Sequence, residues 1–193
     1  MSFYSTEELQ TLGLARFGED VRISKKASIY NPGRISIGNH VRIDDFCVLS
    51  AGEGGIEIGD YVHIAVYCSL MGAGKIKFDD FSGLSSRVSI YSSNDDYSGE
   101  HLTNPTVPSQ FAGVEHSDVN ICKHVIIGSG SVVLPGVILE DGVAIAALSL
   151  VSKNCSAFGV YSGNRRIGER KRDLLELEKQ LLQQSMPSSR DKQ

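Results

Sequence analysis

Aliphatic and aromatic residues recur at every sixth position through most of this 193-residue chain. They form groups of three and then one longer run: Phe17, Ile23, Ile29; Ile37, Ile43, Leu49; Ile58, Ile64, Leu70; Phe78, Leu84, Ile90; Ile121, Ile127, Val133, Leu139, Ile145, Val151. A period of six fits neither a helix nor simple strand alternation, but it fits a coil of three short strands joined by turns. The pattern predicts a β-helix over residues 17–160, with three hexads in each coil.

A second inward position is expected four residues after each aliphatic residue, and small side chains mostly occupy it. These are Val21, Ala27, Val41, Cys47, Val62, Cys68, Ser82, Val88, Val125, Ser131, Val137, Val143, Ser149 and Cys155. Three of the four cysteines are in this set, which favours buried, unreactive thiols, whereas Cys122 points outward. The rhythm breaks at one recurring corner, where Gly33, Glu53, Gly74 and Asn94 stand in the small position. Glycines that directly follow an inward residue, such as Gly38, are expected to supply the conformational freedom of a tight corner.

The largest break separates Ile90 from Ile121, which are 31 positions apart instead of six. A loop over residues 91–118 is therefore expected to leave the coil, and long loops on rigid scaffolds are often functional. Its first half is rich in charge, with Asp95, Asp96, Glu100 and His101.

Helices are expected at both ends of the repeat. Ser5 and Glu8 have capping-box spacing, and the apolar residues that follow predict a short helix over 5–12. Leu174, Leu177 and Leu181 lie on one side of a predicted second helix over 166–184. The polar segment 186–193 is expected to be disordered. Residues 1–193 are thus predicted to form a single all-β domain with these additions.

The composition and charge mainly exclude classes of protein and of site. A net charge of −4 gives no general attraction to nucleic acid, and the chain has no apolar run long enough for a membrane span. The N-terminus lacks the basic and apolar regions of a secretory signal, so a cytoplasmic protein is expected. The cysteine spacings predict no zinc ribbon. The histidines also lack the close pair of the zinc-binding γ-class carbonic anhydrases, so no metal is expected.

Several segments resemble the hexapeptide-repeat acyltransferases, whose fold is a left-handed parallel β-helix. They are ISIGNHVRID, IEIGDYVHI, HVIIGSGSVVLPGVILEDGVAIAALSLVSKN and YSGNRRIG. The resemblance covers residues 17 to 168 and implies a homotrimer that binds acetyl-CoA or another acyl-CoA between neighbouring subunits. The outward apolar residues agree with buried subunit contacts: Ile126, Val132, Ile138, Leu148 and Leu150.

The same resemblance implies coenzyme-binding positions near the C-terminal end of the coil. The small residues Gly128, Ser129, Ala146 and Ala147 match the edges that contact the pantetheine arm. They are equally compatible with a corner that needs small side chains. Lys153, Arg165 and Arg166 are expected to contact coenzyme phosphates, because the guanidinium groups of arginine and the ammonium group of lysine bind phosphate oxygens.

The residues of the loop distinguish two classes of molecule that could receive the acyl group, sugars with a reactive hydroxyl and sugars with a reactive amine. Sugar O-acetyltransferases of this superfamily use a loop histidine as base, but here the loop contains no histidine before His101. The acidic loop instead resembles that of N-acyltransferases acting on dTDP-linked 4-amino-4,6-dideoxy sugars in surface-polysaccharide (O-antigen) synthesis. Sugar O-acetylation remains the alternative, and a noncatalytic scaffold is a third possibility.

The expected roles follow from that acceptor. Asp95 is the first candidate to contact the amine, with Asp96 and Glu100 beside it. His63, which points outward in mid-coil, would hydrogen-bond the substrate or act as base. The remaining candidates for substrate binding lie in or beside the loop: Ser86, Arg87, Tyr91, Asn94 and His101.

Overall fold

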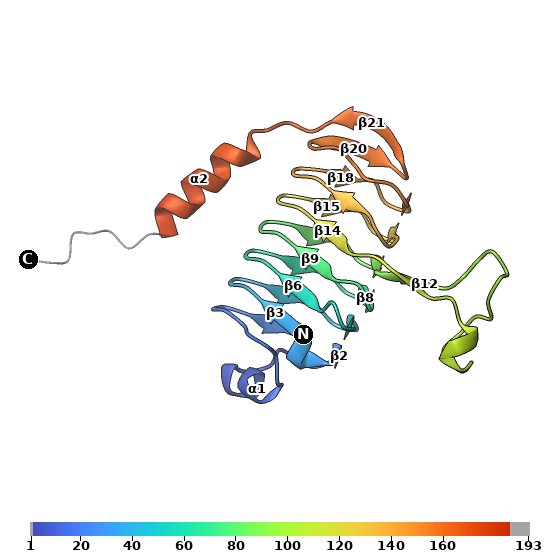
Figure 1. The fold of residues 1–193 in the computed structure, drawn as a ribbon. Helices are drawn as coiled ribbons and strands as arrows, with labels where there is room; N and C mark the ends of the chain where they lie inside the picture. Colours follow the sequence, from blue (N-terminus) through green and yellow to red (C-terminus); the bar gives the residue numbers. More distant parts are fainter. Residues whose placement is uncertain (1, 186–193) are drawn as a thin grey trace, which may run out of the picture.

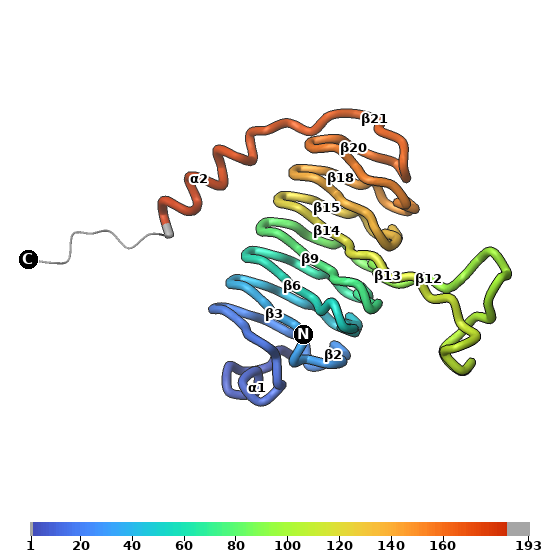
Figure 2. The backbone as a smooth tube through the Cα atoms, in the orientation of Figure 1, coloured from blue at the N-terminus to red at the C-terminus, as the bar shows by residue number. Residues whose placement is uncertain are grey.

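The computed structural model describes residues 2–185, and the chain winds as a parallel β-helix with three faces (Figures 1 and 2). The eight-stranded face contains β1 (Arg22–Ile23), β4 (Arg42–Ile43), β7 (His63–Ile64), β10 (Gly83–Leu84), β15 (Ile126–Ile127), β18 (Ala144–Ile145), β20 (Gly159–Ser162) and β21 (Arg165–Glu169). The six-stranded face contains β2 (Ser28–Tyr30), β5 (Val48–Ala51), β8 (Ser69–Gly72), β11 (Ser89–Tyr91), β16 (Val132–Val133) and β19 (Leu150–Val151). The five-stranded face contains β3 (Ile35–Ile37), β6 (Ile56–Ile58), β9 (Ile76–Phe78), β14 (Val119–Ile121) and β17 (Ile138–Leu139).

The register stacks each inward residue on its counterpart in the next coil. On the eight-stranded face, Ile43 pairs with Ile64, which pairs with Leu84. The predicted inward series is buried from Ile37 to Val151, while Phe17 and Ile29 in the first coil are partly buried. Cys47, Cys68 and Cys155 are buried as predicted. Continuous stacking of apolar side chains therefore forms one core along the axis.

Two kinds of residue make the corners. In most coils, the residue just before a small inward residue has a positive φ. Several of these residues are not glycine: His40, Phe46, Tyr61, Tyr67, Phe81, Arg87, His124 and Leu148. The glycines after inward residues have another purpose, and the sequence-based explanation of them is wrong. Gly38 does not have a positive φ; a Cβ there would lie 2.3 Å from Asp60 Oδ1 and 2.7 Å from the backbone of Gly59. These glycines are needed because the next coil packs too closely for a side chain.

The N-terminal helix α1 (Thr6–Thr11) agrees with the predicted capping box. The Ser5 hydroxyl accepts from the Glu8 amide at 3.2 Å, and the Ser5 amide donates to the Glu8 carboxylate at 2.7 Å. Leu9 is buried against the first coil. The helix therefore covers the apolar end of the core.

The prediction for the C-terminal helix was wrong at its start. Helix α2 is Leu174–Ser185, whereas residues 165–169 form β21, which runs antiparallel to β20. The hairpin turns at Gly163, which has a φ of +58°. This hairpin gives the last coil a hydrogen-bonded partner along its open edge. The tail 186–193 lies outside the described residues, within which no helix is long and apolar enough to cross a membrane.

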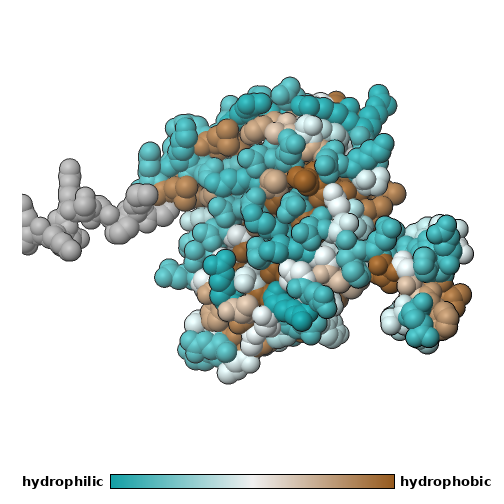
Figure 3. Space-filling model, viewed as in Figure 1, coloured by the Kyte–Doolittle hydropathy of each residue, from teal (hydrophilic) through white to brown (hydrophobic). Residues whose placement is uncertain are grey.

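The long loop leaves the coil at the predicted corner. Its two ends pair as β12 (Ser93–Asn94) and β13 (Glu115–His116), and the Ser93 hydroxyl hydrogen-bonds the His116 ring at 2.8 Å. A 3₁₀ turn, η2 (Ser109–Phe111), lies between them, and a second one, η1 (Pro32–Arg34), occupies a lower corner. The loop projects sideways as a separate lobe with brown apolar patches (Figures 1 and 3).

The packing role of the corner glycines is testable. Gly38→Ala should lower the free energy of unfolding by about 1–3 kcal/mol, because the added methyl group meets fixed backbone. Gly33→Ala is the matched control, since a Cβ at that exposed position meets only Gly13 O at 3.9 Å; its effect should be within about 0.5 kcal/mol. Thermal unfolding followed by circular dichroism measures both. Equal stability of the two variants would contradict the packing argument.

Candidate active site

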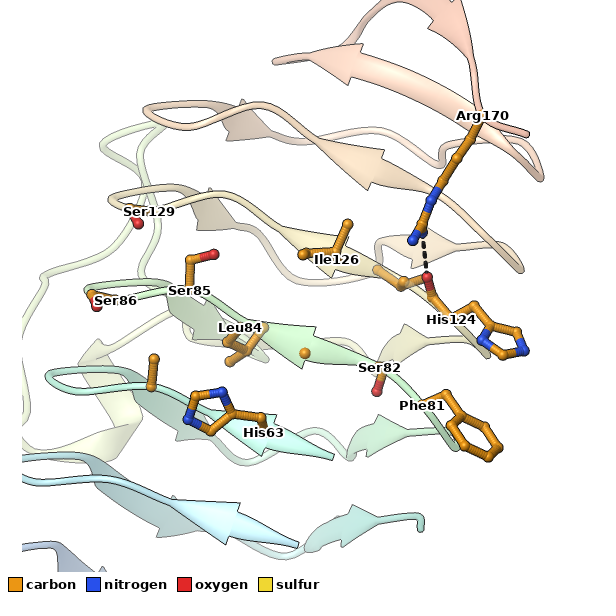
Figure 4. A pocket seen from close by; sticks show the side chains of 13 residues that line it. His63, Phe81, Ser82, Leu84, Ser85, Ser86, His124, Ile126, Ser129 and Arg170 are labelled. Carbon is orange, nitrogen blue, oxygen red and sulfur yellow. Dashed lines mark hydrogen bonds between the residues drawn. The ribbon is translucent and has the colours of Figure 1, made fainter. Parts of the chain in front are cut away.

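A groove of about 460 Å³ lies on the outer side of the eight-stranded face (Figure 4). The register places Gly83 between His63 of β7 and Ile126 of β15. Gly83 has no positive φ, and a Cβ there would meet only His63 O at 3.5 Å, so packing does not require glycine. The missing side chain opens the floor of the groove between its neighbours. Sequence reasoning missed this position, although the glycine in an outward slot was a usable signal.

Hydroxyl groups and aromatic rings line the groove walls. Ser85, Ser86 and Ser129 lie on one side, and Phe81 and His124 lie on the other (Figure 4). Ser86, Ser129 and His63 were predicted site residues, whereas Ser85 was not. The aromatic wall continues a corner column in which successive rings stack at 4.6, 4.8 and 5.2 Å: His40, Tyr61, Phe81 and His124.

His63 is held from the coil below. Its Nε2 lies 2.9 Å from Oδ2 of Asp44, and the Arg42 Nε donates to Oδ1 of the same carboxylate at 2.7 Å. The Asp44 side chain is only 6% exposed, while that of His63 is 52% exposed. A buried carboxylate thus anchors an imidazole that faces the groove.

The loop encloses a second cavity of about 580 Å³. It is lined by five of the predicted residues, Asn94, Asp95, Asp96, Glu100 and His101, together with other loop residues. The two loop aspartates, Asp95 and Asp96, differ in their hydrogen bonds. Asp96 accepts from the amides of Ser98 at 2.7 Å and His101 at 2.8 Å. Hydrogen bonds from Ser98 and then His101 hold the pKa of Asp96 well below its usual range, so this residue orders the loop.

Asp95 is available to a ligand. It is exposed, and within residues 2–185 it has no hydrogen-bond or ion-pair partner. The structure does not bring it together with His63 in one chain, because the two residues line different cavities. Arg87 and Tyr91 line neither cavity. The Arg87 guanidinium lies 5.2 Å from the Tyr67 ring centroid, and Tyr91 ends β11 at the base of the loop.

Comparison with known proteins assigns the chain to a family. No protein-family model matches the chain. A curated relative from Escherichia coli, dTDP-4-amino-4,6-dideoxy-D-glucose acyltransferase, is 55% identical over 180 residues, covering 92% of this chain and 94% of the relative. The chain belongs to this acyltransferase family.

Solved structures agree with that assignment. A variant of AntD, an N-acyltransferase from Bacillus cereus, in complex with dTDP and coenzyme A, is 48% identical with a TM-score of 0.90 over 95% of this chain and 98% of that one. A maltose O-acetyltransferase from Clostridium difficile is 21% identical, with a TM-score of 0.55 over 86% of this chain and 74% of that one, and shares only the fold. The predicted left-handed parallel β-helix of hexapeptide repeats is confirmed.

In this acyltransferase the predicted coenzyme residues do not form one cluster. Only Ser129 of that set lines the groove. A Cβ on Gly128 would lie 2.4 Å from the Ala147 amide, so close coil packing already accounts for the small residue. Ala146 and Ala147 belong to the coil above. Lys153, Arg165 and Arg166 are exposed near the last coil, and the Arg166 side chain is 3.9 Å from Glu169. No cluster of three or more potential metal ligands occurs within the described residues.

Helix α2 is tied to the aromatic wall of the groove. Glu178 lies 2.6 Å from the Lys123 ammonium and 2.7 Å from Nε2 of His124, and both His124 and Glu178 are largely buried. Arg170 also donates to His124 O at 2.6 Å (Figure 4). Burial raises the pKa of Glu178, but hydrogen bonds from Lys123 and His124 outweigh it and lower that pKa overall.

This attachment predicts a pH-dependent helix. Because the pKa of Glu178 is lowered in the folded protein, its stabilisation is present above the ordinary value of 4.5 and is lost as pH falls through the lowered value. Glu178→Gln should therefore increase amide hydrogen exchange in α2 at pH 7 by about tenfold or more. Glu176→Gln is the control, because Glu176 is exposed and its ion pair, with Lys179 at 3.5 Å, lies within α2 and does not attach the helix to the coil. Equal exchange in the two variants would contradict the attachment.

Proposed function

We propose that this enzyme transfers an acyl group from acyl-coenzyme A to the 4-amine of dTDP-4-amino-4,6-dideoxyglucose. The observation that carries the proposal is the 55% identity to the E. coli acyltransferase over nearly the whole of both chains. AntD structures at 47% identity contain dTDP-4-amino-4,6-dideoxyglucose with coenzyme A, or dTDP with 3-hydroxybutyryl-CoA. Acetyl-CoA is the donor that we propose for this chain.

The chemistry fits an amine acceptor. A neutral amine attacks the thioester carbonyl, the C–N bond forms, the C–S bond breaks and coenzyme A leaves as the thiol. The substrate arrives mainly as an ammonium ion, which a carboxylate binds and orients and which loses one proton to solvent before the neutral amine attacks. Asp95 is the group that we propose for this contact, because it is exposed and unpaired within the described residues. Glu100 and His101 are proposed to line the same subsite.

The AntD variants support this choice of aspartate. AntD has been solved with an aspartate replaced and with a serine replaced, and these two residues are ten positions apart. Ser85 and Asp95 have that spacing here, and so do Ser86 and Asp96. Since the Asp96 carboxylate is bonded within the loop, we favour the first pair. Ser85 lines the groove, where its hydroxyl would donate to the developing oxyanion of the thioester.

We further propose a homotrimer in which the loop of one subunit lies against the groove of its neighbour. The separate positions of the two cavities in one chain and the projecting loop support this arrangement (Figure 1). Exposed Ile126, Leu148 and Leu150 supply apolar surface for the contacts.

We also propose that the enzyme works in the cytoplasm, where acyl-coenzyme A and nucleotide sugars are made. There it would catalyse a step in surface-polysaccharide synthesis.

The direct test is turnover with a panel of acceptors. Purified protein, acetyl-CoA and nucleotide-linked amino sugars should release coenzyme A thiol, whereas hydroxyl analogues should not. Failure with every amino sugar and every acyl-coenzyme A tested would reject the proposal.

Asp95→Asn should lower kcat/KM about 100-fold or more while leaving the melting temperature nearly unchanged, because an exposed, unpaired side chain contributes little to folding. Glu53→Gln, an exposed change at another corner, should alter neither quantity. Parallel loss of activity and stability in the Asp95 variant would instead indicate a structural role.

A further inference from the structure

Asp44 is an unusual residue for the outer side of a β-helix, because it is charged and buried. It lies directly after inward Ile43, on the coil below the groove, and its whole surface, backbone included, is 4% exposed. Burying a carboxylate is costly unless each oxygen has a strong partner. Here Arg42 occupies Oδ1 and His63 occupies Oδ2. The protein therefore maintains a buried charge whose second partner is a groove residue.

The carboxylate determines which nitrogen of His63 carries the proton. An ionised carboxylate only accepts hydrogen bonds, so Nε2 of His63 must donate to Asp44. In the neutral ring the lone pair is then on Nδ1. Among residues 2–185, Nδ1 has no hydrogen-bond partner, and the ring lies on the groove below Ser85 (Figure 4). The groove thus contains an oriented proton acceptor.

We infer that Asp44 is a positioning residue that holds His63 with Nδ1 directed into the groove, where Nδ1 accepts the proton that the acceptor amine must lose. The inference rests on the proposed N-acyl transfer. As the amine nitrogen bonds to the thioester carbon, its surplus proton moves to Nδ1. The C–S bond then breaks, and the imidazolium returns the proton to the departing sulfur. The products are the amide and coenzyme A thiol, and His63 is again neutral.

Arg42 makes the arrangement sensitive to the identity of residue 44. Its Nε is a donor, so an asparagine at position 44 must present its carbonyl oxygen to Arg42. The asparagine NH₂ group then faces His63 and requires Nε2 to accept. The proton would move to Nδ1, and the groove would lose its acceptor although the packing is almost unchanged. A comparable tautomer error is known for the aspartate of serine protease triads.

The test uses Asp44→Asn, His63→Gln and the double variant. Gln at position 63 places its amide near the position of Nε2 and removes the Nδ1 acceptor. Each single change should lower kcat about 10²–10⁴-fold with little change in KM, as expected for loss of a general base. The double variant should be no slower than the slower single variant, because both changes remove one function. Multiplied losses, or full kcat in Asp44→Asn, would overturn the inference.

A second readout does not depend on turnover. Nitrogen-15 NMR of the histidine rings should show His63 protonated at Nε2 in the wild-type protein and at Nδ1 in Asp44→Asn. Asp45→Asn is the matched control, since the neighbouring Asp45 bonds Ser24 and Lys26 and does not line the groove that contains His63. It should change neither the tautomer nor kcat. An unchanged tautomer in Asp44→Asn would overturn the inference, whereas wild-type inactivity with every amino sugar would reject only the proposed reaction.

Discussion

The close stacking of one coil on the next is the constraint on which the rest of the structure depends. Parallel strands lie about 4.8 Å apart, so every side chain meets its counterpart from the neighbouring coil. Inside, this spacing makes the aliphatic core; at one corner it stacks aromatic rings from His40 to His124. It also restricts the positions after inward residues to glycine wherever the next backbone is too close, as at Gly38 and Gly128.

The site consists of local departures from this regular stacking. Gly83 removes one side chain from the outward column and leaves the groove. The same register brings Asp44 beside His63, although they are 19 residues apart in the sequence. The long loop leaves the coil at the same corner at which earlier coils contain shorter insertions. A rigid repeat therefore positions the groups that we propose to be reactive, at the places where residues depart from the pattern.

The sequence predicted the β-helix, the buried cysteines and the position of the loop, because all three depend on a period that stacking imposes. It did not predict the hairpin of β20 and β21, since edge pairing leaves no periodic signal in RRIGE. Asp44 was missed because a charged residue beside an arginine is typical of a solvated surface; pairing positions one coil apart would have suggested its contact with His63. The bond from Glu178 to His124 depends on the path of α2, which no repeat determines.

The central claim is that the loop of one subunit and the groove of another complete each active site. Co-expression of Asp95→Asn with His63→Gln tests it directly, because each variant retains the part that the other lacks. If the site is shared, two variants that are nearly inactive alone should give a mixed oligomer with about one quarter of the wild-type turnover, the share of interfaces that pair an intact loop with an intact groove. If the mixture stays as inactive as its separate components, the site is not shared between subunits and the account is wrong.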